Sequence, residues 1–141
     1  MNIHEFGINN DKIIVLIHPS LVMWDYFEYV LSLLKEDYHI IIPALPGYDE
    51  ENPNVNFTSV EKIANSLSRW LIERNIKTID LLYGCSMGGS IALKMFSNQQ
   101  VKIKSIVCDG AITPYQLPWI ITRLIAIKDF LMISMGKIGG L

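Results

Sequence analysis

Residues 78–96 read TIDLLYGCSMGGSIALKMF, in which an apolar extended run passes through glycine into an apolar helical pattern. Residues 84–88 within this stretch form the pattern Gly-x-Ser-x-Gly, and Ser86 stands at its centre. A residue at the tip of so tight a strand-to-helix turn is held in strained backbone geometry, and neighbours two positions away must be small to let the chain pass. The sequence therefore predicts that Ser86 projects from the carboxyl edge of a sheet, with its hydroxyl open to a substrate.

Two backbone N–H groups are expected to face the Ser86 hydroxyl. Met87 begins the following helix, where the first N–H groups are unpaired and the positive end of the helix dipole lies. A second donor usually comes from the loop after an earlier strand, and here that loop begins with His18 and Pro19. Because proline has no N–H, Ser20 is the predicted second donor. Met87 and Ser20 would together stabilise an oxyanion formed beside Ser86.

Extended and helical patterns alternate along the rest of the chain. Strands are expected over residues 13–17, 38–42, 78–83 and 103–108. Helices are expected from Trp24 to about Asp37, from the capping-box pattern Thr58–Glu61 through Leu71, and from Ser90 to Phe96. A short strand over residues 3–6 is expected to pair beside residues 13–17. This alternation predicts an α/β fold with a doubly wound, mostly parallel sheet covered by helices.

Three motifs in order along the chain resemble the α/β-hydrolase family, over about Ile13 to Asp109. His18-Pro19 resembles the family's His-Gly after its third strand, Pro46-Gly47-Tyr48 the loop after its fourth, and Gly84 to Gly89 its nucleophile elbow. The resemblance implies an esterase-like serine hydrolase with Ser86 as the catalytic nucleophile. It also implies that the substrate is an ester, thioester, amide or similar carbonyl compound, and that no metal or cofactor is needed.

The family's triad runs in the chain order serine, acid, histidine, and this sequence departs from that order. His4, His18 and His39 all precede Ser86, and no histidine follows it. His18 is predicted to be a structural residue that hydrogen-bonds neighbouring backbone, and Asp109 a strand-end or turn residue instead of the triad acid. The chain is therefore expected to lack the triad acid and histidine and to be inactive alone, because a lone serine hydroxyl is a poor nucleophile at neutral pH.

The chain is expected to divide into two parts. Residues 1–113 would form the N-terminal part of the hydrolase core, truncated before the last strands, and residues 114–141 the start of a cap, a lid or a packing helix. The segment Leu117–Met135 is strongly apolar, but charged side chains interrupt it, so no transmembrane segment is expected. With nothing to cover it in this chain, the segment would expose a large apolar patch and favour self-association.

The composition favours a small-molecule partner, which is expected to be partly apolar because the segment near the C-terminus is strongly apolar. Twelve Lys and Arg residues against fourteen Asp and Glu give a formal net charge of −2 without a basic block, so no nucleic acid is expected. Cys85 and Cys108 are expected to be free thiols, with Cys85 buried by packing. Two cysteines without a secretory signal fit a cytoplasmic protein.

Two hypotheses remain open from the sequence. In the first, the residues are a fragment of a serine hydrolase, cut inside or just after its cap, whose substrate class stays open among esters, thioesters, amides and carbon–carbon bonds. In the second, the chain is a non-catalytic α/β-hydrolase remnant that serves as a binding or interaction module. The coding sequence after the Leu141 codon separates them, because only the first hypothesis expects a late acid and a final histidine in frame.

Overall fold

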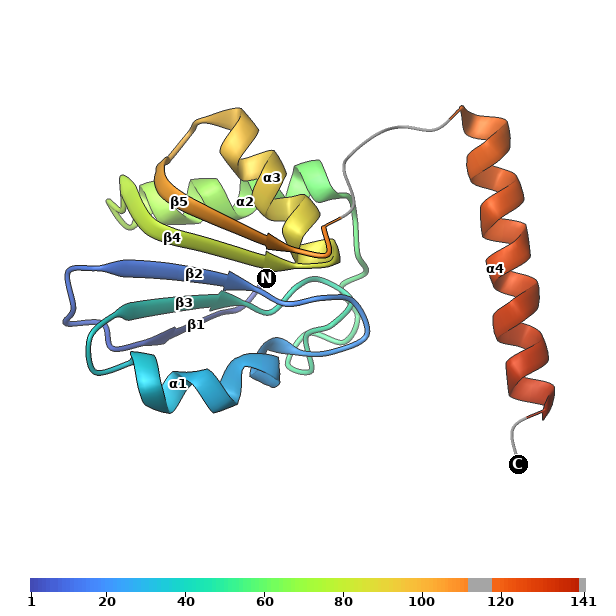
Figure 1. The fold of residues 1–141 in the computed structure, drawn as a ribbon, viewed down its shortest axis with the longest axis horizontal. Helices are drawn as coiled ribbons and strands as arrows, with labels where there is room; N and C mark the ends of the chain where they lie inside the picture. The colour runs from blue at the N-terminus through green and yellow to red at the C-terminus, as the bar shows by residue number, and fades with distance from the viewer. Residues whose placement is uncertain (112–117, 140–141) are drawn as a thin grey trace.

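A five-stranded sheet lies at the centre of the computed structural model, with its strands in the order β1-β3-β2-β4-β5 (Figure 1). The structure describes residues 1–111 and 118–139. The strands are β1 (Ile3–Phe6), β2 (Ile13–Ile17), β3 (His39–Pro43), β4 (Thr78–Cys85) and β5 (Lys102–Asp109). Strand β1 is antiparallel to its neighbour, and all other neighbouring pairs are parallel. The mostly parallel α/β sheet expected from the sequence is thus confirmed.

Helices lie on both faces of this sheet (Figure 1). One face carries the 3-10 helix η1 (Trp24–Phe27) and α1 (Glu28–Leu34), and the other carries α2 (Val60–Glu73) and α3 (Met87–Asn98). Helix α4 (Trp119–Gly139) stands apart from the sheet. The two-sided cover is the doubly wound arrangement that the alternating patterns predict.

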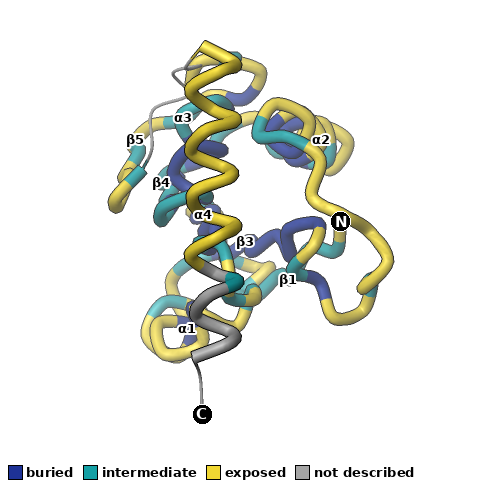
Figure 2. Tube along the Cα trace, turned by 90° about the vertical axis from the view of Figure 1, so that its right-hand side faces the viewer, coloured by how far each residue is buried: buried dark blue, intermediate teal, exposed yellow. Residues whose placement is uncertain are grey.

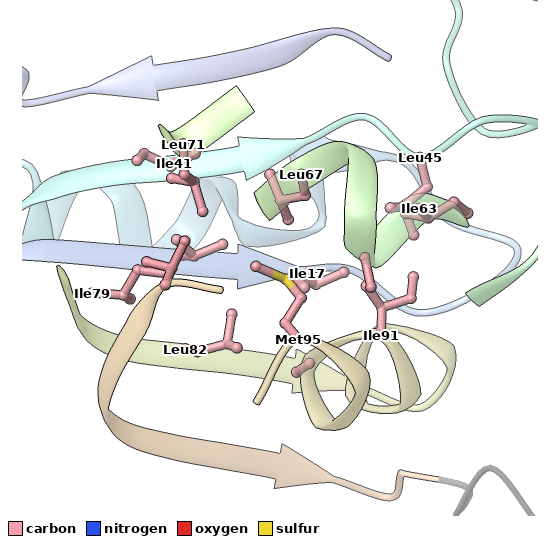
Figure 3. Close-up of a cluster of buried hydrophobic side chains, with 14 residues drawn as sticks. Ile17, Ile41, Leu45, Ile63, Leu67, Leu71, Ile79, Leu82, Ile91 and Met95 are labelled. Carbon is pink, nitrogen blue, oxygen red and sulfur yellow. The ribbon is translucent and has the colours of Figure 1, made fainter. Parts of the chain in front are cut away.

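Buried apolar side chains form two layers, one against each face of the sheet. Along β2, Val15 and Ile17 belong to the layer beneath α2 and α3, whereas Ile14 and Leu16 belong to the layer beneath α1. Figure 3 shows the first of these layers, in which side chains from α2 and α3 meet those of three strands. Strand β2 is therefore buried on both faces, which is why its sequence is continuously apolar.

Strand β1 occupies a different place from the one expected. It pairs with β3, not with β2, and Ile3 lies opposite Pro43 in the register. Strand β3 is buried at every position, whereas β1 is only half-buried and carries His4 and Glu5. Placing the apolar β3 inside the sheet and the partly polar β1 at its edge buries more apolar surface than the reverse order would.

The first helix is shorter than the sequence suggests. Its opening turn is the 3-10 helix η1, and α1 ends at Leu34 instead of continuing to about Asp37. The N–H of Tyr38 donates to the Leu34 carbonyl at 2.9 Å, which closes the helix with a turn. The next N–H, that of His39, donates to the Lys12 carbonyl at 2.8 Å, so the chain must leave the helix here to enter β3 beside β2.

Helix α2 begins one residue later than the expected capping box implies. The N-cap is Ser59, whose hydroxyl accepts a hydrogen bond from the Lys62 N–H at 3.2 Å. Thr58, the first residue of the expected box, lies outside the helix. The backbone N–H of Glu61 and the Ser59 hydroxyl lower the pKa of the Glu61 carboxyl. Two neighbouring hydroxyl residues can both cap in principle, and only the backbone geometry selects between them.

Helix α4 presents its apolar side chains to solvent. Trp119, Leu124 and Phe130 are all more than 60% exposed, and Figure 2 shows the helix as exposed from its start through residue 132. Among the described residues, no helix is long and apolar enough to cross a membrane. The expected boundary at residue 113 lies within 112–117, outside the described residues, and therefore stays a prediction.

The identity of the N-cap can be tested by substitution. We expect Ser59→Ala to lower the free energy of unfolding by about 1 kcal/mol, because an unpaired N–H is left at the start of α2. Thr58→Ala is the matched control and should change it by less than about 0.5 kcal/mol. Urea unfolding followed by circular dichroism measures both. A larger effect at Thr58 than at Ser59 would contradict the assignment.

Candidate active site

Ser86 sits at the turn between the end of β4 and the start of α3, with φ 50° and ψ −115°. This region of backbone space is uncommon for a residue with a side chain and costs energy that the surroundings must supply. Three hydrogen bonds hold the turn. The Ser86 N–H donates to the Asp109 carbonyl at 2.7 Å, and the Ser86 carbonyl accepts from the N–H groups of Gly89 at 3.0 Å and Ser90 at 3.2 Å.

The glycines beside Ser86 are required by close backbone contacts. A Cβ on Gly84 would overlap the carbonyl of Gly88, and a Cβ on Gly88 would overlap the carbonyl of Ile17 at the end of β2. A Cβ on Gly89 would meet the side chain of Ala111, just after β5. The first turn of α3 therefore packs directly on the ends of neighbouring strands, as the small-residue pattern predicts.

The two predicted oxyanion donors lie on adjacent segments at the carboxyl edge of the sheet. Met87 is the first residue of α3, so its N–H has no partner within the helix. Ile17 pairs in register with Gly84, and the loop that begins at His18 therefore leaves the sheet beside the Ser86 turn. Ser20 belongs to that loop. The direction of the Ser20 N–H relative to Ser86 stays a prediction.

His18 is buried and has a hydrogen-bond partner at each ring nitrogen. Its Nδ1 lies 2.8 Å from the Pro19 carbonyl, and its Nε2 lies 3.2 Å from the backbone nitrogen of Leu45. Because the Leu45 N–H can only donate, Nε2 must be the unprotonated nitrogen and Nδ1 the donor. Burial lowers the pKa of His18, which favours this neutral form. These bonds agree with the structural role predicted for His18 and leave no free nitrogen for Ser86.

The other two histidines also bond or stack elsewhere. His39 is the first residue of β3, so it lies at the amino edge of the sheet, opposite to Ser86, and its Nε2 is 3.2 Å from Glu5 Oε2. His4 stacks on Trp24 with ring centroids 3.9 Å apart. Its strand, β1, is three strand spacings from β4, or about 14 Å. None of the three histidines is therefore placed as a base for Ser86.

Asp109, the last residue of β5, accepts hydrogen bonds from Ser86 and from Tyr83, which lies on β4 just before the elbow. Its carbonyl accepts from the Ser86 N–H, and its Oδ2 accepts from the Tyr83 hydroxyl at 3.0 Å. Burial, followed by the nearby Asp109 carboxylate, raises the pKa of Tyr83 to about 12. The strand-end position of Asp109 agrees with the sequence interpretation. No local sequence pattern indicated Tyr83, because its bond to Asp109 depends on the pairing of β4 with β5.

The two cysteines are free thiols, as expected, but neither is buried. Cys85 is half-buried, which corrects the expectation of buried packing, and Cys108 is exposed. Strand β5 forms one edge of the sheet, so side chains near its end lack a neighbouring strand to cover them. The described residues contain no group of three His, Cys, Asp or Glu side chains that could hold a metal ion.

The fold and the elbow geometry together define a hydrolase-like α/β protein, and comparison with known families gives the same class. The sequence model of the alpha/beta hydrolase family matches residues 14–136. The chain therefore belongs to the alpha/beta hydrolase family.

Several solved structures superpose on the chain but are longer. An alpha/beta hydrolase family protein from Desulfitobacterium hafniense matches with a TM-score of 0.75 and 28% identity, over 79% of this chain and 44% of that one. A thermophilic esterase from Thermogutta terrifontis matches with a TM-score of 0.70 and 17% identity, over 83% and 42%. An esterase from Exiguobacterium antarcticum gives 0.63 and 23%, over 77% and 40%. The chain thus spans less than half the length of these proteins.

Because α3 packs closely on the sheet, we expect alanine substitutions at two glycines to lower the free energy of unfolding by different amounts. We expect Gly88→Ala to lower the free energy of unfolding by about 3 kcal/mol, because the new Cβ meets main-chain atoms that cannot move aside. Gly110→Ala is the control. No atom of the described residues lies within 4 Å of its Cβ position, so only its φ of 60° is unfavourable, at about 1 kcal/mol. Equal losses in urea unfolding would contradict the proposed contact with β2.

The protonation state of His18 gives a pH prediction. Its pKa in the folded chain is lowered from 6.5, so the unfolded chain binds this proton at a higher pH than the folded chain does. His18 therefore favours folding above pH 6.5, and its contribution is lost as the pH falls below that value. Nitrogen NMR of the ring should show the neutral form with the proton on Nδ1 at pH 6.5, in contrast to the urea-unfolded chain. A charged ring in the folded chain at pH 7 would contradict this.

Proposed function

We propose that Ser86 is the nucleophile of a serine hydrolase that acts on an ester, thioester or related carbonyl substrate. The observation that carries the proposal is the backbone of Ser86, held at φ 50° and ψ −115° in a chain that belongs to this family. Such a turn presents a hydroxyl beyond the end of a strand, beside the first N–H of a helix. Strained geometry persists only where surrounding contacts enforce it, as the glycine contacts at this turn do.

In the proposed reaction, Ser86 Oγ attacks the carbonyl carbon and forms a tetrahedral oxyanion. The N–H groups of Met87 and Ser20 would donate to that oxyanion, and collapse would expel the leaving group to give an acyl-serine ester. Water then releases the acid and restores the hydroxyl. Both donors are main-chain groups, so side-chain substitution at either position should be tolerated.

The base for this reaction is proposed to come from outside residues 1–141, together with the triad acid. His18 has both ring nitrogens engaged, and His39 lies at the opposite edge of the sheet. Without a base, the serine hydroxyl is not deprotonated as it attacks, and a missing triad member typically costs about 10⁴-fold to 10⁶-fold in turnover. The 141 residues alone are therefore proposed to be inactive.

The same histidine positions support a second candidate function, that of a non-catalytic binding or interaction module. In that role the elbow would hold a small acyl compound without cleaving it. The exposed apolar side chains of α4 support a partly apolar ligand, and they also support self-association through this helix. A cytoplasmic location is proposed on the two free thiols, since cysteines stay reduced in that compartment.

Ester hydrolysis and serine labelling test these proposals together. We expect the 141-residue chain to show no Ser86-dependent turnover of p-nitrophenyl acetate, in either its monomer or its oligomer fraction. A protein extended by in-frame sequence with a late acid and histidine should hydrolyse the ester and react with a fluorophosphonate probe. Ser86→Ala should abolish both signals, whereas Ser20→Ala, the matched control, should keep both because its backbone N–H remains.

Two outcomes would count against the proposal. Hydrolysis and labelling that survive Ser86→Ala in the extended protein would remove Ser86 as the nucleophile. Ser86-dependent turnover by the 141-residue chain at ordinary esterase rates, on the order of 1 to 10³ per second, would reveal a base among its own residues. His18 and His39 would then be the first side chains to substitute.

A further inference from the structure

We infer that the Tyr83 hydroxyl is a positioning group for Ser86, acting through Asp109. This inference rests on the proposed role of Ser86 as the nucleophile. Tyr83 does not bond to Ser86 directly. Its hydroxyl donates to the Asp109 carboxylate, and the carbonyl of the same aspartate accepts the Ser86 N–H. One residue of β5 thus links a side chain of β4 to the main chain of the elbow.

Of these contacts, the hydrogen bond from the Ser86 N–H to the Asp109 carbonyl is the one that holds the strained turn. At 2.7 Å it is the shortest of the three hydrogen bonds that hold the Ser86 backbone. The other two bonds lie within the first turn of α3, so they move with the helix. Of these three bonds, only the one to Asp109 ties the elbow to a neighbouring strand, and it adds to the contact between Gly88 and the end of β2.

The end of β5 needs such an anchor. Strand β5 is an edge strand and pairs only with β4, and Asp109 is its last residue. Strand ends open locally more easily than strand centres, particularly where few buried contacts hold them. After Asp109, Gly110 turns the chain at φ 60°, and no atom in the described part of the chain lies within 4 Å of its Cβ position. The bond from Tyr83 adds a side-chain contact to the main-chain ladder at this strand end.

Tyr83 is suited to hold this carboxylate. Its ring meets Phe27 edge-to-face, with centroids 5.8 Å apart, and it lines a cavity of about 450 Å³ between α1 and the sheet. The ring thus packs against Phe27 on the α1 side, while the hydroxyl reaches the strand end. Because its pKa is raised to about 12, the phenol stays protonated and remains a donor throughout the physiological range.

Amide hydrogen exchange tests the inference on the 141-residue chain itself. We expect Tyr83→Phe to speed exchange of the Ser86 N–H about tenfold, because the phenyl ring keeps its packing but no longer anchors Asp109. The reference is the His39 N–H, which donates to Lys12 at the opposite edge of the sheet. Its exchange should change by less than about twofold, since the substitution leaves global stability nearly unaltered.

Two variants of Asp109 make the test specific. Asp109→Asn keeps an oxygen that accepts from Tyr83 and should stay within about threefold of the wild-type exchange rate at Ser86. Asp109→Ala removes the acceptor and should match Tyr83→Phe. Unchanged Ser86 exchange in Tyr83→Phe, or equal acceleration at Ser86 and His39, would overturn the inference. Amide exchange reports the Ser86 N–H bond and does not require acylation of Ser86. The role of Tyr83 is therefore tested separately from the role of Ser86 as the nucleophile, which probe labelling tests.

Discussion

Direct backbone contact between the first turn of α3 and the end of β2 is the constraint on which the rest of this structure depends. Gly88 approaches the Ile17 carbonyl so closely that no side chain fits between them. That approach forces the chain through a turn in which Ser86 must take a positive φ. It also brings the start of a helix, with its unpaired N–H groups, beside the loop that follows β2.

The loops at the carboxyl edge are tied together by one neutral histidine. His18 follows β2 and accepts the N–H of Leu45, which follows β3, so a single ring links the loop beside the elbow to the next loop along the same edge. A charged ring could not accept this bond, and burial disfavours the charge in any case. His18 thus joins two loops at this edge, and because both of its ring nitrogens are engaged it is unsuited to serve as the base for Ser86.

The described residues leave several apolar surfaces without a partner. Strand β5 has one free edge, and the sheet beside α1 is covered only in part, with a cavity between Phe27, Val30 and Tyr83. Helix α4 exposes nearly all of its described side chains. The matched structures are more than twice as long as the regions that align with this chain.

The sequence alone determined the elements, the two-sided burial of β2 and β3, and the elbow at Ser86, because each is encoded in local patterns of apolar residues and glycine. It also indicated a structural role for His18. It placed β1 beside β2 instead of β3, because strand order is not encoded locally. It also placed the cap of α2 one residue early, because Thr58 and Ser59 have the same local chemistry. Only the tertiary structure decided that Tyr83 reaches Asp109 and that His18 bonds to Leu45. Those residues are 26 and 27 positions apart, and their meeting depends on strand order and register, which no local pattern specifies.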